Sequence, residues 1–293
     1  MKLQSIIVML CLSLSCLTGC IDRDLCYYST HPHSGLVKPV FNWKTTEWGT
    51  SEIPAKGFSF LFVGENTYSY DTVGVYRIVT GDYNSIMYNK DVKAMFRSES
   101  DITGLQAYTE VLGGITSEPG VIFRDLNNIS VFPDDTTNLV LEPKAAVKGV
   151  NLTVKVEGLD APSHIVSING YMKGCATAVN LSTLERLAPE GTLVFPMRRV
   201  APGTTDFTAR VTTFGPYEES GNILSLDLNL YSGGTVTFPF DLSKYWLDAE
   251  TNNMDVINCT LTVRITKLGI STGDTEGDVI IDEWGPGTWD TLL

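Results

Sequence analysis

The fold class is decided by the stretch Val150-Asn151-Leu152-Thr153-Val154-Lys155-Val156, in which aliphatic and polar residues alternate strictly. Successive side chains of a β-strand point to opposite faces of the sheet, so this stretch predicts a strand with one buried face and one face in water. The same period of two recurs at 224–230 and 261–265. Further strands are predicted at 165–172, 207–214, 235–240 and 279–284, and Pro239 is expected at a sheet edge or a strand end.

The residues before this stretch show the same kind of pattern. Turn residues separate the predicted strands at intervals of about ten, which is typical of a β-sandwich. The pattern breaks at Pro133-Asp134-Asp135-Thr136-Thr137-Asn138, and helices are expected only at 181–188 and 242–249. We therefore predict an all-β chain of two tandem β-sandwich domains, 40–142 and 143–293. The predicted strands of the first domain are 40–43, 57–63, 73–79, 85–88, 108–112 and 129–132.

The start of the chain has the layout of an export signal. Lys2 precedes an apolar run at 6–12, which is too short to span a bilayer as a permanent helix. The run is followed by Leu17-Thr18-Gly19-Cys20, which resembles the bacterial lipobox. This resemblance implies that residues 1–19 are a lipoprotein signal peptide and that the Cys20 thiol carries diacylglycerol. The alternative is an ordinary secretory signal with a cysteine near its cleavage site. Residues 20–39 hold turn formers and are predicted to be a tether.

The mature chain is strongly acidic. Removing residues 1–19 leaves 274 of the 293 residues, and it removes only Lys2 among the charged groups, so 20 basic and 34 acidic residues give a net charge of −14. Such a surface repels phosphate backbones and anionic lipid headgroups. The sequence therefore argues against nucleic-acid binding, and membrane attachment is expected through acyl chains on Cys20 alone.

Two cysteines in the second half could pair in an oxidising compartment. Cys175 and Cys259 both fall in predicted strands, so one disulfide between them is one interpretation. Two buried, reduced cysteines that act as small apolar residues are the other interpretation. The sequence alone leaves both open.

The motifs of common catalytic and cofactor sites do not occur in this sequence. It contains no phosphate-binding loop, dinucleotide fingerprint, nucleophile elbow or zincin motif, so we predict no catalytic, cofactor-binding or metal-binding residues and no enzymatic activity. A hydrolase built on the acidic residues is the weakest alternative. The tryptophans Trp43, Trp48, Trp284 and Trp289 are expected to pack in or around the core, or else to stack on sugar rings.

Several phrases spread along the chain resemble one protein family. The chain resembles the fimbrillin-like lipoproteins of Bacteroidota, in particular the anchor and minor-subunit family of type V pili. Their order along the chain carries the resemblance more than any single phrase. They are Cys20 with Asp22-Arg23-Asp24-Leu25-Cys26, the stretch 80–89 (TGDYNSIMYN), Leu141-Glu142-Pro143, Ile168-Asn169-Gly170-Tyr171-Met172, Thr213-Phe214-Gly215, Phe240-Asp241-Leu242-Ser243 and the last strand ending at Trp284.

The resemblance implies a fold and a function. It implies two tandem transthyretin-like, Greek-key sandwiches and assembly by strand donation, in which an extended segment of one subunit completes a sheet of the next. The expected protein is an outer-membrane lipoprotein, facing the cell surface, that anchors a fimbria-like assembly or forms a minor part of it. Its expected partners are the membrane, through Cys20, and other fimbrillin-like subunits. The residues expected to pair between subunits are Val279, Ile280, Ile281 and Trp284.

Glycan binding is the stronger of the alternative functions. The protein could be a glycan-binding surface lipoprotein in which Trp48 and Trp289 are exposed platforms for sugar rings.

Overall fold

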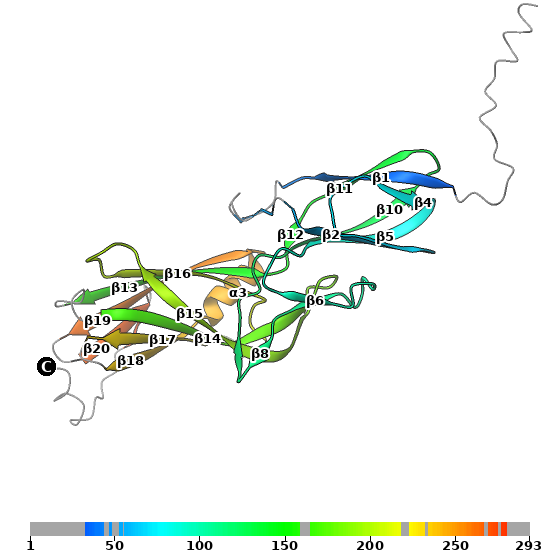
Figure 1. Ribbon diagram of the computed structural model, residues 1–293. Coiled ribbons are helices and arrows are strands. Elements are labelled where there is room, and N and C mark those ends of the chain that lie inside the picture. The colour runs from blue at the N-terminus through cyan, green and yellow to red at the C-terminus, as the bar shows by residue number, and fades with distance from the viewer. Residues whose placement is uncertain are drawn as a thin grey trace, which may run out of the picture.

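The computed structural model of the protein describes residues 33–43, 47–48, 53–54, 56–158, 165–217, 223–231, 234–266, 269–274 and 277–279. Within these ranges the chain consists of β-strands joined by turns, together with a single helix, α3 (Ser243–Thr251). The strands form two sandwiches that lie end to end in an elongated molecule (Figure 1). The all-β fold class predicted from the sequence is confirmed.

The first sandwich is built from two sheets. The smaller sheet has the order β11 (Thr136–Leu141), β1 (Ser34–Phe41), β4 (Tyr76–Val79). The larger sheet has the order β12 (Lys144–Ala145), β10 (Phe123–Val131), β5 (Gly81–Asn89), β2 (Phe58–Val63), β3 (Thr67–Tyr70). Their facing sides bury one apolar cluster, which is rich in aromatic rings and comprises Val37, Phe58, Phe60, Phe62, Tyr76, Ile78, Tyr83, Met87, Ile129, Val131, Leu139 and Leu141.

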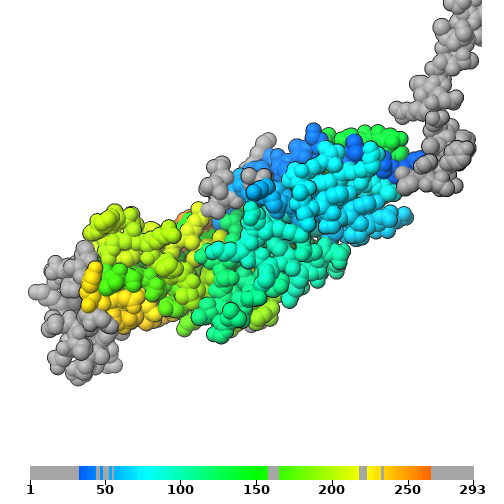
Figure 2. All heavy atoms as spheres, in the orientation of Figure 1, coloured from blue at the N-terminus to red at the C-terminus, as the bar shows by residue number. Residues whose placement is uncertain are grey.

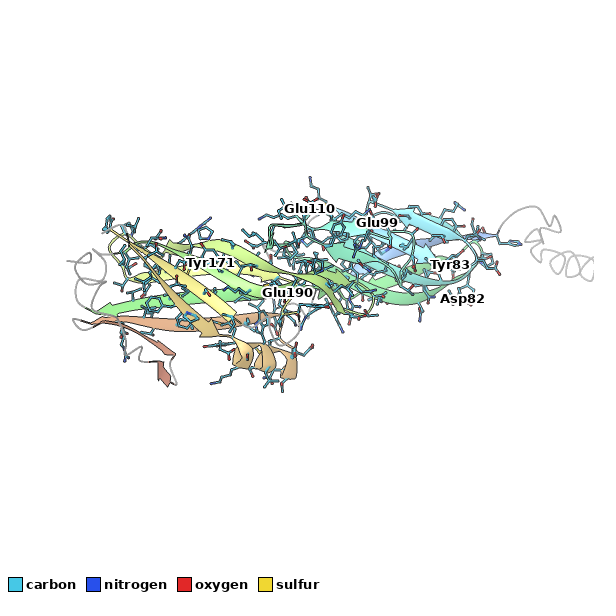
Figure 3. The ribbon with its side chains drawn as sticks, turned by 90° about the horizontal axis from the view of Figure 1, so that it is seen from below. Asp82, Tyr83, Glu99, Glu110, Tyr171 and Glu190 are labelled. Atoms are coloured by element: carbon cyan, nitrogen blue, oxygen red, sulfur yellow. The ribbon has the colours of Figure 1, made fainter. Side chains whose placement is uncertain are left out.

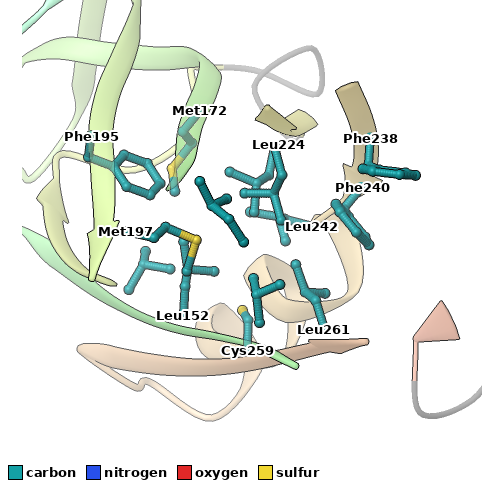
Figure 4. Packing of buried hydrophobic residues seen from close by; sticks show 14 of the residues in the cluster. Leu152, Met172, Phe195, Met197, Leu224, Phe238, Phe240, Leu242, Cys259 and Leu261 are labelled. Atoms are coloured by element: carbon teal, nitrogen blue, oxygen red, sulfur yellow. The ribbon is translucent and has the colours of Figure 1, made fainter. Parts of the chain in front are cut away.

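The second sandwich is one long path of paired strands that folds back on itself. Its order is β18 (Thr235–Asp241), β17 (Ile223–Leu230), β14 (Ile165–Asn180), β15 (Arg186–Arg199), β16 (Asp206–Thr213), β13 (Lys148–Gly158), β19 (Val256–Thr266), β20 (Gly269–Asp274), β21 (Gly277–Val279). Strands β15 and β16 pair only at Arg198 and Arg199, so the path bends there into two facing sheets. Figure 4 shows the core between them, which includes Leu152, Met172, Phe195, Met197, Leu224, Phe238, Phe240, Leu242, Cys259 and Leu261.

The strand that decided the fold class behaves as predicted. In β13 the residues Val150, Leu152, Val154 and Val156 are each at most 1% exposed. Burial of each of these four aliphatic side chains contributes roughly 1.5–3 kcal/mol to the free energy that favours the folded state. Pro239 lies in β18, which is an edge strand of its sheet, and this prediction is also confirmed.

The two sandwiches share a third apolar cluster where they meet. Four short strands that follow β5 and precede β10 in the sequence connect the halves: β6 (Met95–Arg97), β7 (Gln106–Tyr108), β8 (Val111–Leu112) and β9 (Ile115–Thr116). Strand β7 pairs with the end of β14, and β9 runs parallel to β15. In Figure 2 the atoms of this region, in teal, lie between the cyan first sandwich and the yellow-green second one. The shared cluster includes Trp48, Leu105, Ala107, Ile122, Phe123, Val147, Ala176, Val179, Leu181 and Phe214.

Some predicted elements differ from the observed ones. Strand β1 starts at Ser34 rather than at residue 40, so residues 34–39 belong to the sandwich and not to a tether. Helix α3 agrees with the helix predicted at 242–249. The helix predicted at 181–188 is wrong, because this segment is a tight turn followed by the start of β15. The Asn180 side chain accepts hydrogen bonds from the main-chain N–H groups of Ser182 and Thr183 at 2.8 and 3.1 Å, as a helix cap would. Leu184 then takes a left-handed conformation (φ 63°), which ends the turn.

Candidate functional site: strand β1 and the sheet edges

Strand β1 is the central strand of the smaller sheet in the first sandwich. It runs parallel to β11 from Leu36 opposite Thr136 to Phe41 opposite Leu141. On its other side it runs antiparallel to β4, from Ser34 opposite Val79 to Val37 opposite Tyr76. Because β11 and β4 do not pair with each other in this sheet, β1 alone joins them.

The side of β1 that faces the core is held by close packing. Val37 is fully buried, and Tyr76 opposite it is 4% exposed, so that burial raises the pKa of Tyr76 to about 12. Gly35 approaches the main chain of the turn after β10 so closely that a β-carbon built on it would lie 2.2 Å from the carbonyl oxygen of Phe132. Only glycine fits there without movement of the backbone. This strand is therefore an integral part of the sandwich.

Pro39 occupies a position in β1 that costs no hydrogen bond of the ladder. The N–H groups of Leu36 and Asn42 donate to the carbonyl oxygens of Asp135 and Leu141 at 2.8 Å each, so the main-chain N–H and C=O groups of even-numbered residues in β1 point toward β11. The main-chain groups of odd-numbered residues, including Pro39, point toward the side on which β4 lies. The pairing with β4 ends at Val37, so among the described strands none needs the N–H that Pro39 lacks.

Of the residues predicted to pair between subunits, Val279 lies within the described part of the chain. Val279 is in β21, opposite Thr272 of β20, and β21 is the final strand of the sheet path. Ile280, Ile281 and Trp284 lie outside the described residues. The strand itself begins at Gly277, two residues earlier than predicted.

Trp48 is not a platform for sugar rings. It is 3% exposed and belongs to the cluster at the junction of the sandwiches. The guanidinium carbon of Arg210 lies 5.3 Å from its ring centroid. Trp43 is also packed, with its ring stacked on Phe41 at 5.8 Å and edge-on to Phe123 at 5.1 Å. The glycan-binding alternative based on an exposed Trp48 is therefore wrong, and Trp289 lies outside the described residues.

The residue before Trp48 also contacts the second sandwich. The Glu47 carboxylate accepts hydrogen bonds from the main-chain N–H groups of Asp255 and Val256 at 2.8 and 3.1 Å. Nearby, Lys148 Nζ donates to the Met254 carbonyl oxygen at 2.6 Å and lies 3.2 Å from Asp255 Oδ1. Burial raises the pKa of Asp255 despite the charge of Lys148. These contacts fix residues 47–48 to the start of β13 and β19.

Cys175 and Cys259 are both buried in the core of the second sandwich and are not joined by a disulfide. Of the two interpretations left open by the sequence, the structure supports the buried, reduced pair. Burial raises the pKa of the Cys175 thiol to about 11, so the thiol is protonated at neutral pH. Its Sγ donates to the Met172 carbonyl oxygen at 3.4 Å.

A group of charged and hydroxyl side chains lies on the first sandwich around Lys90. Lys90 Nζ lies 3.0 Å from Asp71 Oδ1 and also contacts the carboxylate of Glu99, which is labelled in Figure 3. Glu99 accepts a hydrogen bond from Tyr88 Oη at 2.8 Å, and Ser59 donates to Asp71. Burial lowers the pKa of Lys90, but its hydrogen bonds to Glu99 and Asp71 outweigh this and raise it. The group ties β2 and β5 to the residues that follow β3 and β6.

The described residues contain no group of three or more His, Cys, Asp or Glu side chains placed to hold a metal ion. None of the helices within the described ranges is long and apolar enough to cross a membrane. Cys20, the predicted point of lipid attachment, lies outside the described residues, and the lipid anchor stays a prediction.

The sequence signal for β1 as a central strand was incomplete. Val37 alternates with Lys38, but Val40 beside Phe41 breaks the alternation, and Gly35 and Pro39 both argue against a central strand. The role of residues 47–48 at the junction has no local signal, because their contacts come from residues about a hundred or more positions away.

Several solved structures of other proteins are similar to this one. No protein-family model and no curated protein matches the sequence. Among solved structures, a candidate adhesin from Bacteroides ovatus matches with 17% identity and a TM-score of 0.55, over 78% of this chain and 89% of that chain. A second candidate adhesin from Bacteroides ovatus matches with 10% identity and a TM-score of 0.53, over 84% of this chain and 94% of that chain.

A fimbrial anchor protein from Porphyromonas gingivalis is also similar. It is 11% identical, with a TM-score of 0.50, and the match covers 80% of this chain and 91% of that chain. At such low identity the likeness establishes the architecture alone. The chain thus has the tandem β-sandwich fold of these adhesins and of this fimbrial anchor, as the resemblance in its sequence predicted.

Proposed function

We propose that this protein is a non-enzymatic lipoprotein of the outer membrane that faces the cell surface. In this proposal it anchors a fimbria-like assembly or forms a minor part of it, and it joins other fimbrillin-like subunits through main-chain pairing of β-strands. The similarity of its fold to a fimbrial anchor and to candidate adhesins supports an adhesive or fimbrial role.

The observation that carries the proposal is the position of β1. This strand follows the predicted lipid-attachment region directly and joins β11 to β4 at the centre of its sheet. A subunit held to the membrane through Cys20 cannot release β1 for exchange without losing its anchor. Such a subunit suits the base of a fibre, where it can offer an edge to a neighbour but keeps its own first strand.

The C-terminal strand is the proposed contact with the next subunit. Within the described residues β21 pairs on one side only, with β20, and three residues of it are described. We propose that residues 279–284 extend this edge and pair with another subunit. Lipid at Cys20 holds the membrane, and the first sandwich stands nearest to it.

The test is a pull-down of the tagged protein from native outer membranes, with unboiled and boiled samples compared by gel electrophoresis and mass spectrometry. We expect a heat-sensitive ladder that contains other fimbrillin-like subunits, because extensive main-chain pairing is kinetically stable in detergent but not on boiling. A lone monomer, or co-purification with a porin only, would contradict the assembly role.

Two variants separate the membrane contact from the subunit contact. Cys20→Ala should release the protein from the membrane and leave the ladder intact. Deletion of residues 279–293 should leave the protein folded and membrane-bound but remove it from the ladder. Normal co-assembly of a folded deletion variant would rule out the C-terminal strand as the contact.

A further inference from the structure

Strand β11 lies at the edge of its sheet, and little in its sequence protects its outer side from pairing with another strand. Its six residues, Thr136–Leu141, contain no charged side chain, no proline and no glycine. Within the described residues β11 pairs only with β1, so its other side has no partner strand. Natural edge strands are usually blocked by charges, prolines or bulges, because an unblocked edge accepts further strands.

The main-chain groups on this edge can be assigned from the hydrogen bonds. The carbonyl oxygens of Asp135 and Leu141 accept hydrogen bonds from β1. The main-chain groups of odd-numbered residues in β11 therefore point toward β1, and those of even-numbered residues point away from it, toward the open edge. The outward N–H of Thr136 donates to the side chain of Asp135 at 2.7 Å, and that of Glu142 donates to the side chain of Asp125 at 2.7 Å. Carboxylates thus occupy both ends of the edge.

The centre of the edge is different. The outward main-chain groups of Asn138 and Val140 have no hydrogen-bond partner among the described residues. The Val140 side chain is 54% exposed, and Val40, its neighbour across the pair of strands, is 41% exposed. Two exposed valines side by side on the outer face form an apolar row that ends at the open edge. A third apolar side chain on an added strand would extend this row.

The charges around the edge argue against a second copy of this chain as its occupant. Antiparallel pairing of two β11 strands about Asn138 would join their outward groups, but it would also place Asp134 of each copy opposite Glu142 of the other. Like charges directly opposite each other destabilise a pair of strands. The net charge of −13 adds general repulsion between copies.

The same charges favour a basic partner. Four carboxylates, those of Asp125, Asp134, Asp135 and Glu142, lie at the ends of the edge, and the basic side chain of Lys38 lies one strand further in, on the residue that pairs with Asn138. We infer that the outer edge of β11 accepts an extended segment of another protein, with a neutral, β-branched centre and Lys or Arg at both ends. This inference rests on the proposed assembly role and adds to it an edge that receives a strand. The two are tested separately, because peptide binding tests the edge and co-purification tests the assembly role.

The experiment uses the full chain with Cys20→Ala and two fluorescein-labelled peptides, KTVTVTK and its charge-reversed twin ETVTVTE, followed by fluorescence anisotropy. We expect the basic peptide to bind at least about tenfold more tightly than the acidic one, and 0.5 M NaCl to reduce this preference. Val140→Lys should weaken binding of the basic peptide at least about tenfold. Asn138→Pro removes an outward N–H and not a bond to β1, and it should have the same effect.

The matched control is Val194→Lys, which changes another exposed valine in β15 of the second sandwich and should leave binding unchanged. Circular dichroism and the melting temperature show that each variant is folded. Equal binding of the two peptides, or binding unaffected by both β11 variants, would overturn the inference. The inference would also be overturned if the protein without a β11 substitution formed a dimer at neutral pH and Val140→Lys abolished that dimer. The occupant of the edge would then be a second copy of this chain. In either case the pull-down could still succeed, since it reports on assembly through any contact.

Discussion

The indole ring of Trp48 lies directly against the main chain at Gly149. A β-carbon built on Gly149 falls 2.7 Å from Cη2 and 3.1 Å from Cζ3 of Trp48, both closer than van der Waals contact allows. Trp48 comes from the segment between β1 and β2, whereas Gly149 is the second residue of β13 in the second sandwich. The contact therefore couples the two halves, and Glu47 supports it through its hydrogen bonds to Asp255 and Val256.

The first prediction concerns this contact. Gly149→Ala should lower the free energy of unfolding by about 2 kcal/mol, because the new methyl group overpacks the ring. Trp48→Ala should lower it by about 3 kcal/mol through the lost burial and the cavity that remains. In the Trp48→Ala background the effect of Gly149→Ala should nearly vanish, since the next nearest atom, Val256 Cγ2, is 3.3 Å away. Urea unfolding of the four proteins of this double-mutant cycle gives the coupling energy, and additive effects would contradict the contact.

The second prediction concerns β1. Gly35→Ala should destabilise the protein by about 3 kcal/mol, because the methyl group would meet the Phe132 carbonyl oxygen and must push β1 away from it. Hydrogen exchange should show faster opening of β1, β4 and β11 than of β13. Gly74→Ala is the matched control, since a β-carbon there meets only Tyr76 Cε1 at 3.8 Å. If both variants have the same stability, β1 is not held by this approach.

The third prediction concerns the buried thiols. Cys175 and Cys259 should react with a thiol reagent at pH 8 at least about a hundredfold more slowly in the folded protein than in guanidinium, because burial excludes the reagent and keeps Cys175 protonated. Peptide mass spectrometry reads each cysteine separately. Both should be labelled after unfolding without a reductant. Labelling only after reduction would show that they form a disulfide.

The Cys175 thiol also predicts a pH dependence. Its pKa in the folded protein, about 11, is raised above the ordinary value of 9.0. An acid with a raised pKa binds its proton more tightly in the folded state, so folding is penalised once the unfolded chain loses that proton. Stability should therefore fall as the pH rises from 9 toward 11, and Cys175→Ala should fall less over this range. Equal slopes for the two proteins would contradict the burial of this thiol.

The strands that the sequence predicted best are those with one wet face. In β13, β17 and β19 the alternation of apolar and polar residues is carried by the strand itself, and burial on one face follows from it. Strand β15 had no such signal, because Pro189, Gly191 and Pro196 argue against a central strand. In the structure Pro196 lies in the part of β15 between its short pairings with β9 and β16, where a missing N–H costs little.

The sequence could not predict the junction of the halves. Strands β7 and β9 are only three and two residues long, and they are held by pairing with β14 and β15, some seventy residues further along the chain. No local pattern reports such partners. The same reason explains Trp48, whose burial depends on Gly149, and the open edge of β11, whose character depends on which side β1 occupies. The division into domains near residue 142 stays a prediction.

The last prediction concerns the charged group around Lys90. The pKa of Asp71 is lowered, chiefly by the hydrogen bond from Ser59 and then by Lys90. A carboxylate with a lowered pKa stabilises the fold above its ordinary value of 3.8, and this contribution is lost as the pH falls through the lower value of the folded state. Because the Asp71 side chain is 67% exposed, water screens the pair and the contribution should be only about 0.5 kcal/mol. Asp71→Asn should lower stability by this amount at pH 7 and have no effect near pH 2, as measured by urea unfolding. Glu110→Gln, at an exposed position of the same half, should change stability at neither pH, and a loss at pH 2 equal to that at pH 7 would show that Asp71 acts through packing rather than charge.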